Sequence, residues 1–528
     1  MKPGYLAIAV SLFLILGGLL LNQDLPLDND EPFYYLLGKS LYLGQGYRDI
    51  YYPGNPPHVT YPFFYPLLLC LAMSISQNIL FLKSINILFG AGAILLSAIL
   101  FQDKRNTVLK LFIPLVAINL WMLSFSVTLA AEIPYLFFSL LSLLLLERYG
   151  RTSCGLGLLL LALLASFFIK SLGFLLVCSG ALFLVMNREH GKARRMLILW
   201  LPLPLIWSIR NLALSGEAVS ITYLKQFAAS IPDGNLLKYL FHALPYNIGQ
   251  YFQTLPRLFL AGYFLGENGF EGASYFIPLY SSVHKGLHLL DFKKPDLLLN
   301  ILFWGVLIKG MVAQFKTRRL LVLYPLLYLL LLLFWAPRAT LDCKYRYLLP
   351  LLPFLLYYFL YGLSLRGKGT FLTHAAALFI LVYNLFPAVE SAKINLPYFL
   401  HYRDMSDEER GSYHPFWYAD YFMACAWVRD HTLYKSVIMH HSPPACFIYS
   451  QRKTVFFHEM PWEPGRIEVS RIGETLQNRG VDYLISRGAT EERDERIVSS
   501  LSQDWSFKTV LKTGQEQYPL TIYGVRKR

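Results

Sequence analysis

Long apolar runs constrain the fold of this chain more than any other feature of its sequence. Residues 5–21 contain no charged side chain, and similar runs recur along residues 1–400. A helix needs roughly 20 apolar residues to cross the hydrocarbon core of a bilayer, which is about 30 Å thick. Because 55% of the residues are hydrophobic and the mean hydropathy is +0.41, the sequence predicts a polytopic α-helical membrane protein.

Clusters of basic residues predict which loops face the cytoplasm, because Lys and Arg are enriched on that side. The clusters lie at residues 103–105, 148–151, 188–195, 316–319 and 366–368. With residues 5–21 as a retained anchor helix, the apolar runs predict about eleven spans. The other spans are expected near residues 81–102, 107–127, 132–147, 155–169, 172–187, 196–210, 297–314, 320–336, 346–364 and 370–387.

Counting spans from these clusters predicts two long external loops in a membrane domain of residues 1–400. Residues 23–80 form the first loop. Within it, residues 63–75 should lie in the outer interface or dip into it, because a full span there would put a basic cluster outside. Residues 212–296 form the second loop, and their several Pro and Gly residues predict surface helices along the membrane.

The formal net charge of +14 does not indicate a nucleic-acid partner. Residues 401–528 contain 17 basic and 17 acidic side chains, which leaves 31 basic and 17 acidic ones in residues 1–400. The excess therefore lies in the hydrophobic part of the chain, where it marks short cytoplasmic loops beside a lipid bilayer.

Residues 401–528 predict a soluble α/β domain that span counting places on the periplasmic or extracellular side. Strand-like and helix-like runs alternate there. The strands are expected at residues 436–439, 454–457, 481–485, 509–511 and 520–525, and the helices at residues 416–431, 466–479 and 491–501. The sequence leaves two roles open for this domain, acceptor binding and a structural cap.

The six cysteines are scattered and have neither metal-binding nor redox-motif spacing. Cys425 and Cys446 could form a disulfide if the C-terminal domain is external. His440 and His441 are adjacent at a strand end, so their side chains should point to opposite faces. We therefore predict no metal site from these residues.

A cluster of acids follows the first span. Asp24, Asp28, Asp30 and Glu31 lie where the chain is expected to leave the bilayer. Clustered carboxylates suit a general base or a cation site. The alternative is a helix N-terminus, with an Asp as N-cap and Pro32 in the first turn. The two interpretations are compatible, because a cap also holds a carboxylate still.

Other charged residues lie at the external ends of predicted spans. Glu132 begins a span, and the alternative to a functional role is a favourable charge for the helix dipole. Lys170 lies at the tip of a hairpin of spans, where snorkelling is the alternative. Arg210, which precedes Asn211, and Arg346 are external against the charge rule. They suggest an anionic partner, and salt bridges with local acids are the alternative.

These residues together predict a lipid phosphate as substrate. A polyprenyl phosphate would lie along the spans with its phosphate at the outer leaflet, where Arg346, Arg210 and Lys170 would bind it. Tyr345 is a further candidate at this site. A carboxylate of the acidic cluster would take a proton from an acceptor hydroxyl. Because a phosphate ester is a good leaving group, no general acid is required.

Motifs in a fixed order resemble those of the C-type glycosyltransferases. They are D-x-D-E-P at residues 28–32 with a later Y-P-L-L-L, A-E-I-P-Y-L-F at 131–137, W-x-x-R-N at 207–211 followed by Gly216, and R-Y-L-L-P-x-x-P at 346–353. Within this family the chain is most similar to the protein O-mannosyltransferase superfamily. That superfamily includes the bacterial aminoarabinose transferase of lipid A and the rhizobial lipopolysaccharide galacturonosyltransferases.

The resemblance implies a C-type glycosyltransferase fold, a polyprenyl-phosphate-sugar donor, inversion at the anomeric carbon and a catalytic acid in the first external loop. It assigns the Asp-Glu pair of the family to Asp30 and Glu31 and the second external acid to Glu132. The phosphate-binding arginine corresponds to Arg346. Asp30 is the predicted base, with Asp28 and Glu31 in support, and Glu132 is expected to orient the acceptor or a cation.

The chain departs from the lipid A enzyme before the Pro-Pro motif of that enzyme, where this sequence has Tyr61 in place of a lysine. We therefore expect Lys170 or Lys83 to supply the missing charge. The departure weakens the match to a lipid A substrate. Tyr61 and Asn211 are expected to support the acceptor side.

The sequence thus predicts an inverting glycosyltransferase that moves one sugar to a hydroxyl of a glycan, glycolipid or protein at the outer face of a bacterial inner membrane. No cofactor is required, and a divalent cation at the acids is left open. One alternative is a non-catalytic flippase or binding subunit, which would need polar residues throughout the membrane depth. The other is an O-antigen-ligase-like polymer transferase, which would need an external loop rich in Arg and His.

Overall fold

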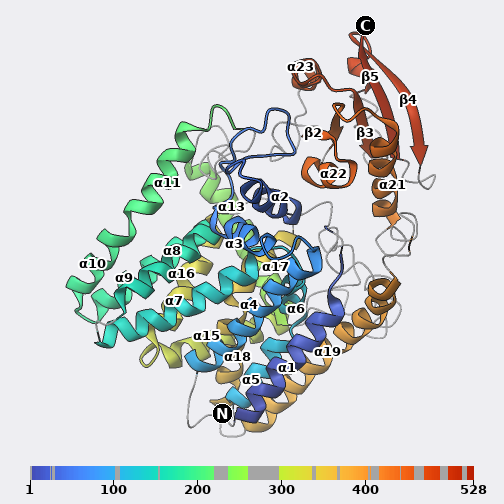
Figure 1. Ribbon diagram of the computed structural model, residues 1–528. Coiled ribbons are helices and arrows are strands. Elements are labelled where there is room, and N and C mark those ends of the chain that lie inside the picture. The colour runs from blue at the N-terminus through green and yellow to red at the C-terminus, as the bar shows by residue number, and fades with distance from the viewer. Residues whose placement is uncertain are drawn as a thin grey trace.

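A computed structural model describes most of the chain. The described residues are 3–23, 25, 30–101, 108–152, 155–218, 236–259, 297–335, 341–365, 369–401, 405, 416–440, 442–456, 469–487, 498–513 and 520–528. Helices of the first 401 residues form a bundle, and a smaller unit with a β-sheet lies at one end of it (Figure 1).

The bundle consists of helices whose bounds largely follow the apolar runs of the sequence. They are α1 (Pro3–Leu20), α4 (Ile79–Leu100), α5 (Val108–Ile118), α6 (Leu120–Ser126), α7 (Glu132–Thr152), α8 (Leu156–Ile169), η1 (Ser171–Gly173), α9 (Phe174–Met186), α10 (His190–Trp200), α11 (Pro202–Ala213), α13 (Leu236–Phe259), α15 (Leu297–Phe315), α16 (Arg319–Trp335), α17 (Leu341–Leu348), η5 (Leu349–Leu351), α18 (Leu352–Ser364) and α19 (Gly369–His401). The outer helices expose apolar side chains, among them Ile198, Leu201 and Ile206 of the α10–α11 segment, as expected for helices that face lipid.

Within the described residues, five helices are long and apolar enough to cross a membrane. They are Ile79–Leu100, Glu132–Gly150, His190–Ala213, Tyr345–Ser364 and Phe371–Pro397. Shorter apolar helices accompany them, including α1, α8, α9, α15 and α16. The chain therefore has the helices of a multi-pass membrane protein, while the expected number of about eleven spans stays a prediction.

The span predicted over residues 107–127 is divided into two helices, α5 and α6. Between them, Asn119 has an extended backbone, and its side-chain oxygen accepts hydrogen bonds from the backbone N–H groups of Trp121 and Met122 at 3.1 and 3.2 Å. This is an N-cap, which satisfies donors that would otherwise be orphaned at the start of α6. Apolar periodicity alone does not reveal such a break.

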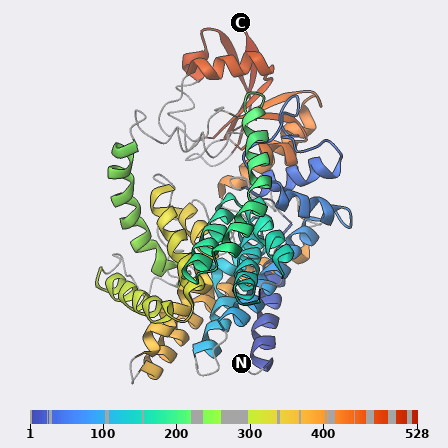
Figure 2. The same cartoon turned by 90° about the vertical axis from the view of Figure 1, so that its left-hand side faces the viewer.

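Helix α13 corrects the prediction of surface helices over residues 212–296. It packs against α15, α16, α17 and α18, and Figure 2 shows it (bright green) beside the yellow α15–α16 segment. Its last turn enters the bundle core, where the Asn119 side chain donates to the carbonyl of Leu258 at 2.9 Å and the Asn384 side chain donates to that of Phe259 at 2.7 Å. The remaining parts of the predicted loop, residues 219–235 and 260–296, lie outside the described residues.

Helices α2 (Glu31–Tyr42) and α3 (Phe64–Met73) pack together at the end of the bundle that carries the β-sheet unit (Figure 1). Close contact depends on Gly38 of α2, since a Cβ there would lie 2.9 Å from the Cβ of Leu69. With 10 residues, α3 is about 15 Å long. That is half the thickness of a bilayer core, which agrees with the prediction that this segment dips into the interface.

Two glycines allow α15 and α18 to cross at backbone contact distance. A Cβ on Gly310 would overlap the carbonyl of Tyr358, and one on Gly362 would overlap the carbonyl of Val306. Small residues at such crossings are typical of membrane helices, which gain van der Waals contact by close approach.

The C-terminal unit has a mixed sheet with the strand order β2-β1-β3-β5-β4 among the described residues. Strand β1 pairs in parallel with β2 and β3, and β5 pairs antiparallel with β3 and β4. The strands are β1 (Val437–His440), β2 (Lys453–Phe456), β3 (Tyr483–Arg487), β4 (Trp505–Thr513) and β5 (Leu520–Lys527), and the helices are α21 (Phe416–His431), α22 (Pro443–Ser450) and α23 (Val469–Arg479). The strands lie where the alternation of apolar residues predicts them, whereas α22 was not predicted because it is short and starts with two prolines.

The sheet unit packs directly on the first predicted external loop. Apolar residues of both parts form one buried cluster, which contains Leu36, Ile50, Tyr51, Tyr52, Met439, Val455, Ile472 and Leu476. The backbone N–H of Thr454 donates to the carbonyl of Tyr51 at 2.9 Å. Lys453 Nζ donates to the Ile50 carbonyl at 2.6 Å and to Asn55 Oδ1 at 2.7 Å. The loop is therefore held between the bundle and the sheet.

Candidate active site

Four charged side chains from separate parts of the chain form a network of ion pairs at the end of the bundle that carries the first predicted external loop. Asp30 precedes α2, Glu132 is the first residue of α7, Lys170 lies between α8 and η1, and Arg346 belongs to α17. Their convergence agrees with the span counting, which puts all four on the external side. Asp24 and Asp28, also predicted here, lie outside the described residues.

Arg346 connects two acids that are remote in sequence. Its Nη2 donates to Asp30 Oδ2, and its Nε donates to Glu132 Oε1. The side chains of Arg346 and Asp30 retain 18% and 22% of their exposure, whereas that of Glu132 is fully buried. A planar guanidinium can serve both carboxylates at once, which a point-like ammonium cannot do as well.

Lys170 forms a second ion pair with Glu132, in addition to the pair with Arg346. Its Nζ donates to the same Oε1 atom at 2.6 Å and lies 5.8 Å from the centre of the Tyr347 ring. Burial lowers the pKa of Lys170, and the carboxylate of Glu132 opposes this effect. Among the described residues, the second carboxylate oxygen of Glu132 has no hydrogen-bond partner. A buried acceptor of this kind is costly unless a ligand or water supplies a donor.

Asp30 has the position of a helix N-cap but not its hydrogen bond. It occupies the N-cap of α2, and Pro32 lies in the first turn, yet the carboxylate caps no backbone N–H. Instead the Tyr61 hydroxyl donates to Asp30 Oδ1 at 2.7 Å. The carboxylate is thus turned toward Arg346 and Tyr61, so the helix-cap interpretation holds for the backbone and not for the side chain.

Glu31 points away from this cluster and into the protein. It is fully buried, accepts a hydrogen bond from the backbone N–H of Leu129 at 2.8 Å, and lies 3.9 Å from Lys83 Nζ. Lys83 also donates to Asn22 Oδ1 at 2.8 Å. Glu31 therefore fixes the segment just before Glu132, and Lys83 pairs with Glu31 rather than with the Asp30–Arg346 pair.

A buried aspartate–histidine pair holds Tyr61 in place. His58 Nε2 accepts the backbone N–H of Tyr61 at 2.9 Å, so Nδ1 carries the proton of the neutral ring and donates to Asp49 Oδ1 at 2.9 Å. The rings of His58 and Tyr61 stack with 5.3 Å between their centres and 10° between their planes. Because Tyr61 reaches Asp30, the pair acts on the acid through the tyrosine.

Arg210 contacts the loop that carries Tyr61. Its Nη1 donates to the carbonyl of His58 at 2.6 Å and to the side chain of Asn211 at 2.7 Å, and its guanidinium packs over the Trp207 ring at 4.9 Å. It pairs with none of the acids among the described residues. The predicted role of Arg210 as a phosphate ligand beside Arg346 and Lys170 stays a prediction.

Tyr345 lies inside the bundle beside the site. Its ring is 4% exposed and stacks on Trp121 with 4.4 Å between ring centres. This stacking fixes the start of the segment that carries Arg346. The predicted role of Tyr345 as a direct phosphate ligand stays a prediction.

Sequence reasoning missed Asp49 and His58. They are nine positions apart in a Pro- and Gly-rich loop, where no helical or strand period relates them. The remaining signal, a polar pair in a loop with several tyrosines, is weak. No group of three or more His, Cys, Asp or Glu side chains able to hold a metal ion is present among the described residues, and the divalent cation stays a prediction.

The fold of the chain has counterparts among solved structures. The chain has the fold of the C-type glycosyltransferases AglB and ArnT. The resemblance found in the motifs is therefore confirmed for the fold. No family model matches the sequence, and no curated protein sequence matches it.

Two solved structures are similar to this chain over nearly its whole length. The oligosaccharyltransferase AglB from Archaeoglobus fulgidus, in complex with an inhibitory peptide and a dolichol-phosphate, superposes with a TM-score of 0.55 at 14% identity, over 99% of this chain and 74% of that one. ArnT from Cupriavidus metallidurans, bound to undecaprenyl phosphate, superposes with a TM-score of 0.54 at 11% identity, over 99% of this chain and 98% of that one. At these identities the similarity concerns the fold.

Proposed function

We propose that the chain is an inverting glycosyltransferase that moves a sugar from a polyprenyl-phosphate carrier to a hydroxyl of a glycan, glycolipid or protein. Two features support the proposal. The fold is that of AglB and ArnT, whose solved complexes contain dolichol-phosphate and undecaprenyl phosphate. The external end of the bundle also carries acids and cations in direct contact.

The observation that carries the proposal is the position of Arg346 between Asp30 and Glu132. Without a substrate, the acids neutralise Arg346 and Lys170. A donor phosphate offers these cations a stronger, bidentate partner. Its binding would draw Arg346 away from Asp30, which then becomes available as a base. Donor binding and base activation would therefore be linked through one guanidinium.

The chemistry of the transfer follows from these positions. Asp30 accepts the proton of the acceptor hydroxyl as that oxygen attacks the anomeric carbon of the sugar. The bond between the anomeric carbon and the phosphate oxygen breaks, and the polyprenyl phosphate leaves with the electron pair. Arg346 and Lys170 stabilise the charge on the leaving phosphate. Attack from the face opposite the phosphate inverts the anomeric configuration.

The other site residues have supporting roles in this proposal. Glu132 positions the two cations and orients the acceptor through its second oxygen. Tyr61 holds Asp30, and Arg210 with Asn211 acts on the acceptor side. The site belongs to the outer face of a bacterial inner membrane, with residues 401–528 in the periplasm. No cofactor is required, and a divalent cation would have to bind at the acids.

The test is transfer of radiolabelled sugar from a panel of polyprenyl-phosphate sugars in membranes that contain the full chain. Asp30→Asn keeps an oxygen that can accept the Tyr61 hydroxyl but removes the base. We expect transfer to fall by about 100-fold or more while donor binding is retained. The panel identifies the donor at the same time.

The matched control is Glu390→Gln, which neutralises an acid that pairs with Lys393 on the surface of α19. It should transfer at the wild-type rate. Unchanged transfer by Asp30→Asn would remove Asp30 as the base. Binding of a donor without transfer by the wild type, with every acceptor tried, would support the flippase or binding-subunit interpretation instead.

A further inference from the structure

Two cysteines face each other inside the C-terminal unit. The thiol of Cys425 on α21 donates to Cys446 Sγ on α22, with 3.6 Å between the sulfur atoms. Both side chains are fully buried in an apolar cluster with Tyr421, Val428 and Ala445. A disulfide needs the sulfur atoms about 2 Å apart. A shift of about 1.5 Å, shared between two side chains, is within the reach of small rotations about their χ1 angles.

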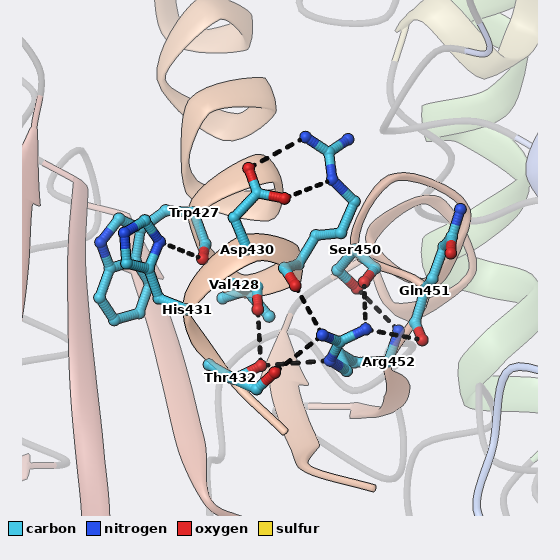
Figure 3. A network of polar contacts seen from close by, with 9 residues as sticks. Trp427, Val428, Asp430, His431, Thr432, Ser450, Gln451 and Arg452 are labelled. Carbon is cyan, nitrogen blue, oxygen red and sulfur yellow. Dashed lines mark hydrogen bonds and ion pairs between the residues drawn. The ribbon is translucent and has the colours of Figure 1, made fainter. Parts of the chain in front are cut away.

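A polar network already joins the far ends of the same two helices. Figure 3 shows Arg452, just after α22, beside the last turn of α21. Its Nη2 donates to the carbonyl groups of Arg429 and Thr432 at 2.6 and 2.8 Å, and its Nη1 donates to that of Ser450 at 3.3 Å. These carbonyls end helices and would otherwise be orphaned. The two helices are thus fixed at one end by Arg452 and meet at the cysteines about 10 Å away along α21.

We propose that Cys425 and Cys446 form a disulfide in the mature protein and that this bond, with Arg452, clamps α22 to α21. The two thiols lose two protons and two electrons as the sulfur–sulfur bond forms. The electrons pass to the disulfide of a thiol–disulfide oxidase of the external compartment, through a mixed disulfide, and reduce it to a dithiol. This inference depends on the external location proposed for the C-terminal unit and not on sugar transfer.

The bond must form early in folding. The contact with Cys446, together with burial, raises the pKa of the Cys425 thiol well above its usual range. Only a thiolate attacks a disulfide, so the folded pair would react slowly with an oxidase. Oxidation therefore takes place before α21 and α22 close over the two sulfur atoms.

The clamp matters to the active site because α22 is the helix that rests on the first external loop. It contacts α2, and the Tyr449 hydroxyl both donates to the carbonyl of Leu25 at 2.9 Å and accepts its N–H at 3.0 Å. Leu25 lies five residues before Asp30. A fixed α22 thus restricts the segment that leads into the proposed base.

The test counts free thiols in the full chain isolated from membranes and denatured with maleimide present. The chain contains six cysteines, so a disulfide gives four labels without reduction and six after reduction. Peptide mapping should recover one cross-linked species that joins Cys425 to Cys446. Six labels without reduction, or a cross-link between other cysteines, would overturn the proposal.

Two further variants separate this proposal from others. Cys446→Ser should give five labels with and without reduction, and three labels without reduction would mean that another pair is oxidised. Asp30→Asn should keep the four-label result of the wild type, because it affects the transferase and not the disulfide. Loss of transfer and loss of the disulfide can therefore be told apart.

Limited proteolysis with trypsin tests whether the disulfide holds α22 against α21. Arg452 is 7% exposed, so the folded chain should be cut slowly after it. We expect reduction to raise the rate of cleavage after Arg452 several-fold and to leave cleavage after the exposed Arg479 unchanged. Equal rates of cleavage after Arg452 with and without reductant would show that the disulfide does not hold α22 against α21.

Discussion

At the scale of single residues, the charge balance around Arg346 decides what the site can do. Asp30 and Glu132 both bind this arginine, and Lys170 shares the carboxylate oxygen of Glu132. Breaking a partly buried network of this kind by removing one member costs several kcal/mol, because the remaining charges lose their partners. A ligand that replaces one carboxylate with another anion avoids this cost, and the proposed donor phosphate is such a ligand.

Tyr61→Phe tests the proposed role of Tyr61 in holding Asp30. The variant removes the hydroxyl that donates to Asp30 Oδ1 and keeps the ring that stacks on His58. A hydrogen bond to a charged group contributes about 1.5–3 kcal/mol, so we expect transfer to fall by about tenfold or more, in kcat rather than in KM for the donor. Kinetics of sugar transfer measure both.

The control for this variant is Tyr434→Phe, which removes a hydroxyl from a ring that is 80% exposed. It should leave kcat unchanged. A wild-type kcat in Tyr61→Phe would mean that the Tyr61 hydroxyl does not hold Asp30 during transfer.

Sequence reasoning grouped charged residues that the structure also brings together, while their roles in catalysis and phosphate binding stay predictions. Asp30, Glu132, Lys170 and Arg346 were found because ionisable residues next to apolar runs are rare, and the structure brings them into contact. Arg210 was grouped with them because span counting gives only the side of the membrane and no lateral position. Which acid of a pair faces inward, as Glu31 does, depends on the helix phase relative to its neighbours.

At the scale of elements, β1 carries a buried histidine that makes the C-terminal sheet sensitive to acid. His440 is fully buried, its Nδ1 accepts the N–H of Ser442 at 2.9 Å, and burial lowers its pKa from 6.5 to about 4. Between these pH values the unfolded chain binds a proton that the folded chain does not. Stability is therefore complete above about pH 6.5 and falls as the pH is lowered, by about 2 kcal/mol at pH 5.

Pulse proteolysis of the full chain in increasing urea, at about pH 7 and about pH 5, measures this loss for the C-terminal fragment. His440→Asn keeps an acceptor near the position of Nδ1 and removes the titration, so its urea midpoint should change less between the two pH values. Identical shifts in the wild type and in His440→Asn would assign the acid sensitivity to another group.

The α15–α18 crossing supplies a second prediction at this scale. In Gly362→Ala the new methyl group meets the carbonyl of Val306, and backbone cannot move aside as a flexible side chain can. Overpacking of this kind costs about 1–3 kcal/mol, so the melting temperature in detergent should fall. Gly305→Ala on α15, where nothing lies within 4 Å of the added carbon, should melt as the wild type does.

Elements were predicted well where one period dominated and poorly where polar residues capped or broke a helix. The long apolar helices and the C-terminal strands follow this rule. Helix α13 did not, because Pro245 and Pro256 lie inside it and suggested breaks. The bundle tolerates Pro256 because the carbonyl of Phe252, which loses its helical donor to this proline, accepts a hydrogen bond from Trp304 Nε1 at 3.1 Å.

At the scale of the whole molecule, the loop over residues 23–80, predicted to be external, joins the two parts of the chain. Asp30 and Glu31 contact residues of the bundle, and Tyr51 and Tyr52 pack against the sheet unit. The order of basic clusters predicts that distant charges lie at one end of the bundle, and the structure brings four of them into contact. That the C-terminal unit covers the loop could not be predicted, because its contacts involve backbone carbonyls and single side chains without a sequence pattern.

Lys453→Met tests whether the C-terminal unit stabilises the active-site loop. Lys453 Nζ binds the Ile50 carbonyl and Asn55 Oδ1, and Met keeps the apolar stem while removing the donor. The lost hydrogen bonds contribute about 2 kcal/mol to the stability of the closed loop. The equilibrium constant for opening of the loop should therefore rise by about tenfold or more. Tyr51 and Tyr52 are each 1% exposed, and chymotrypsin cleavage after them reports this opening. We expect faster cleavage together with a several-fold loss of transfer, because Asp30 and Tyr61 flank the loosened segment.

The control is Lys508→Met, which removes an exposed lysine of β4 and should change neither the cleavage rate nor the rate of transfer. Faster cleavage with normal transfer would mean that the unit protects the loop without shaping the site, and unchanged cleavage would mean that the bundle alone holds the loop.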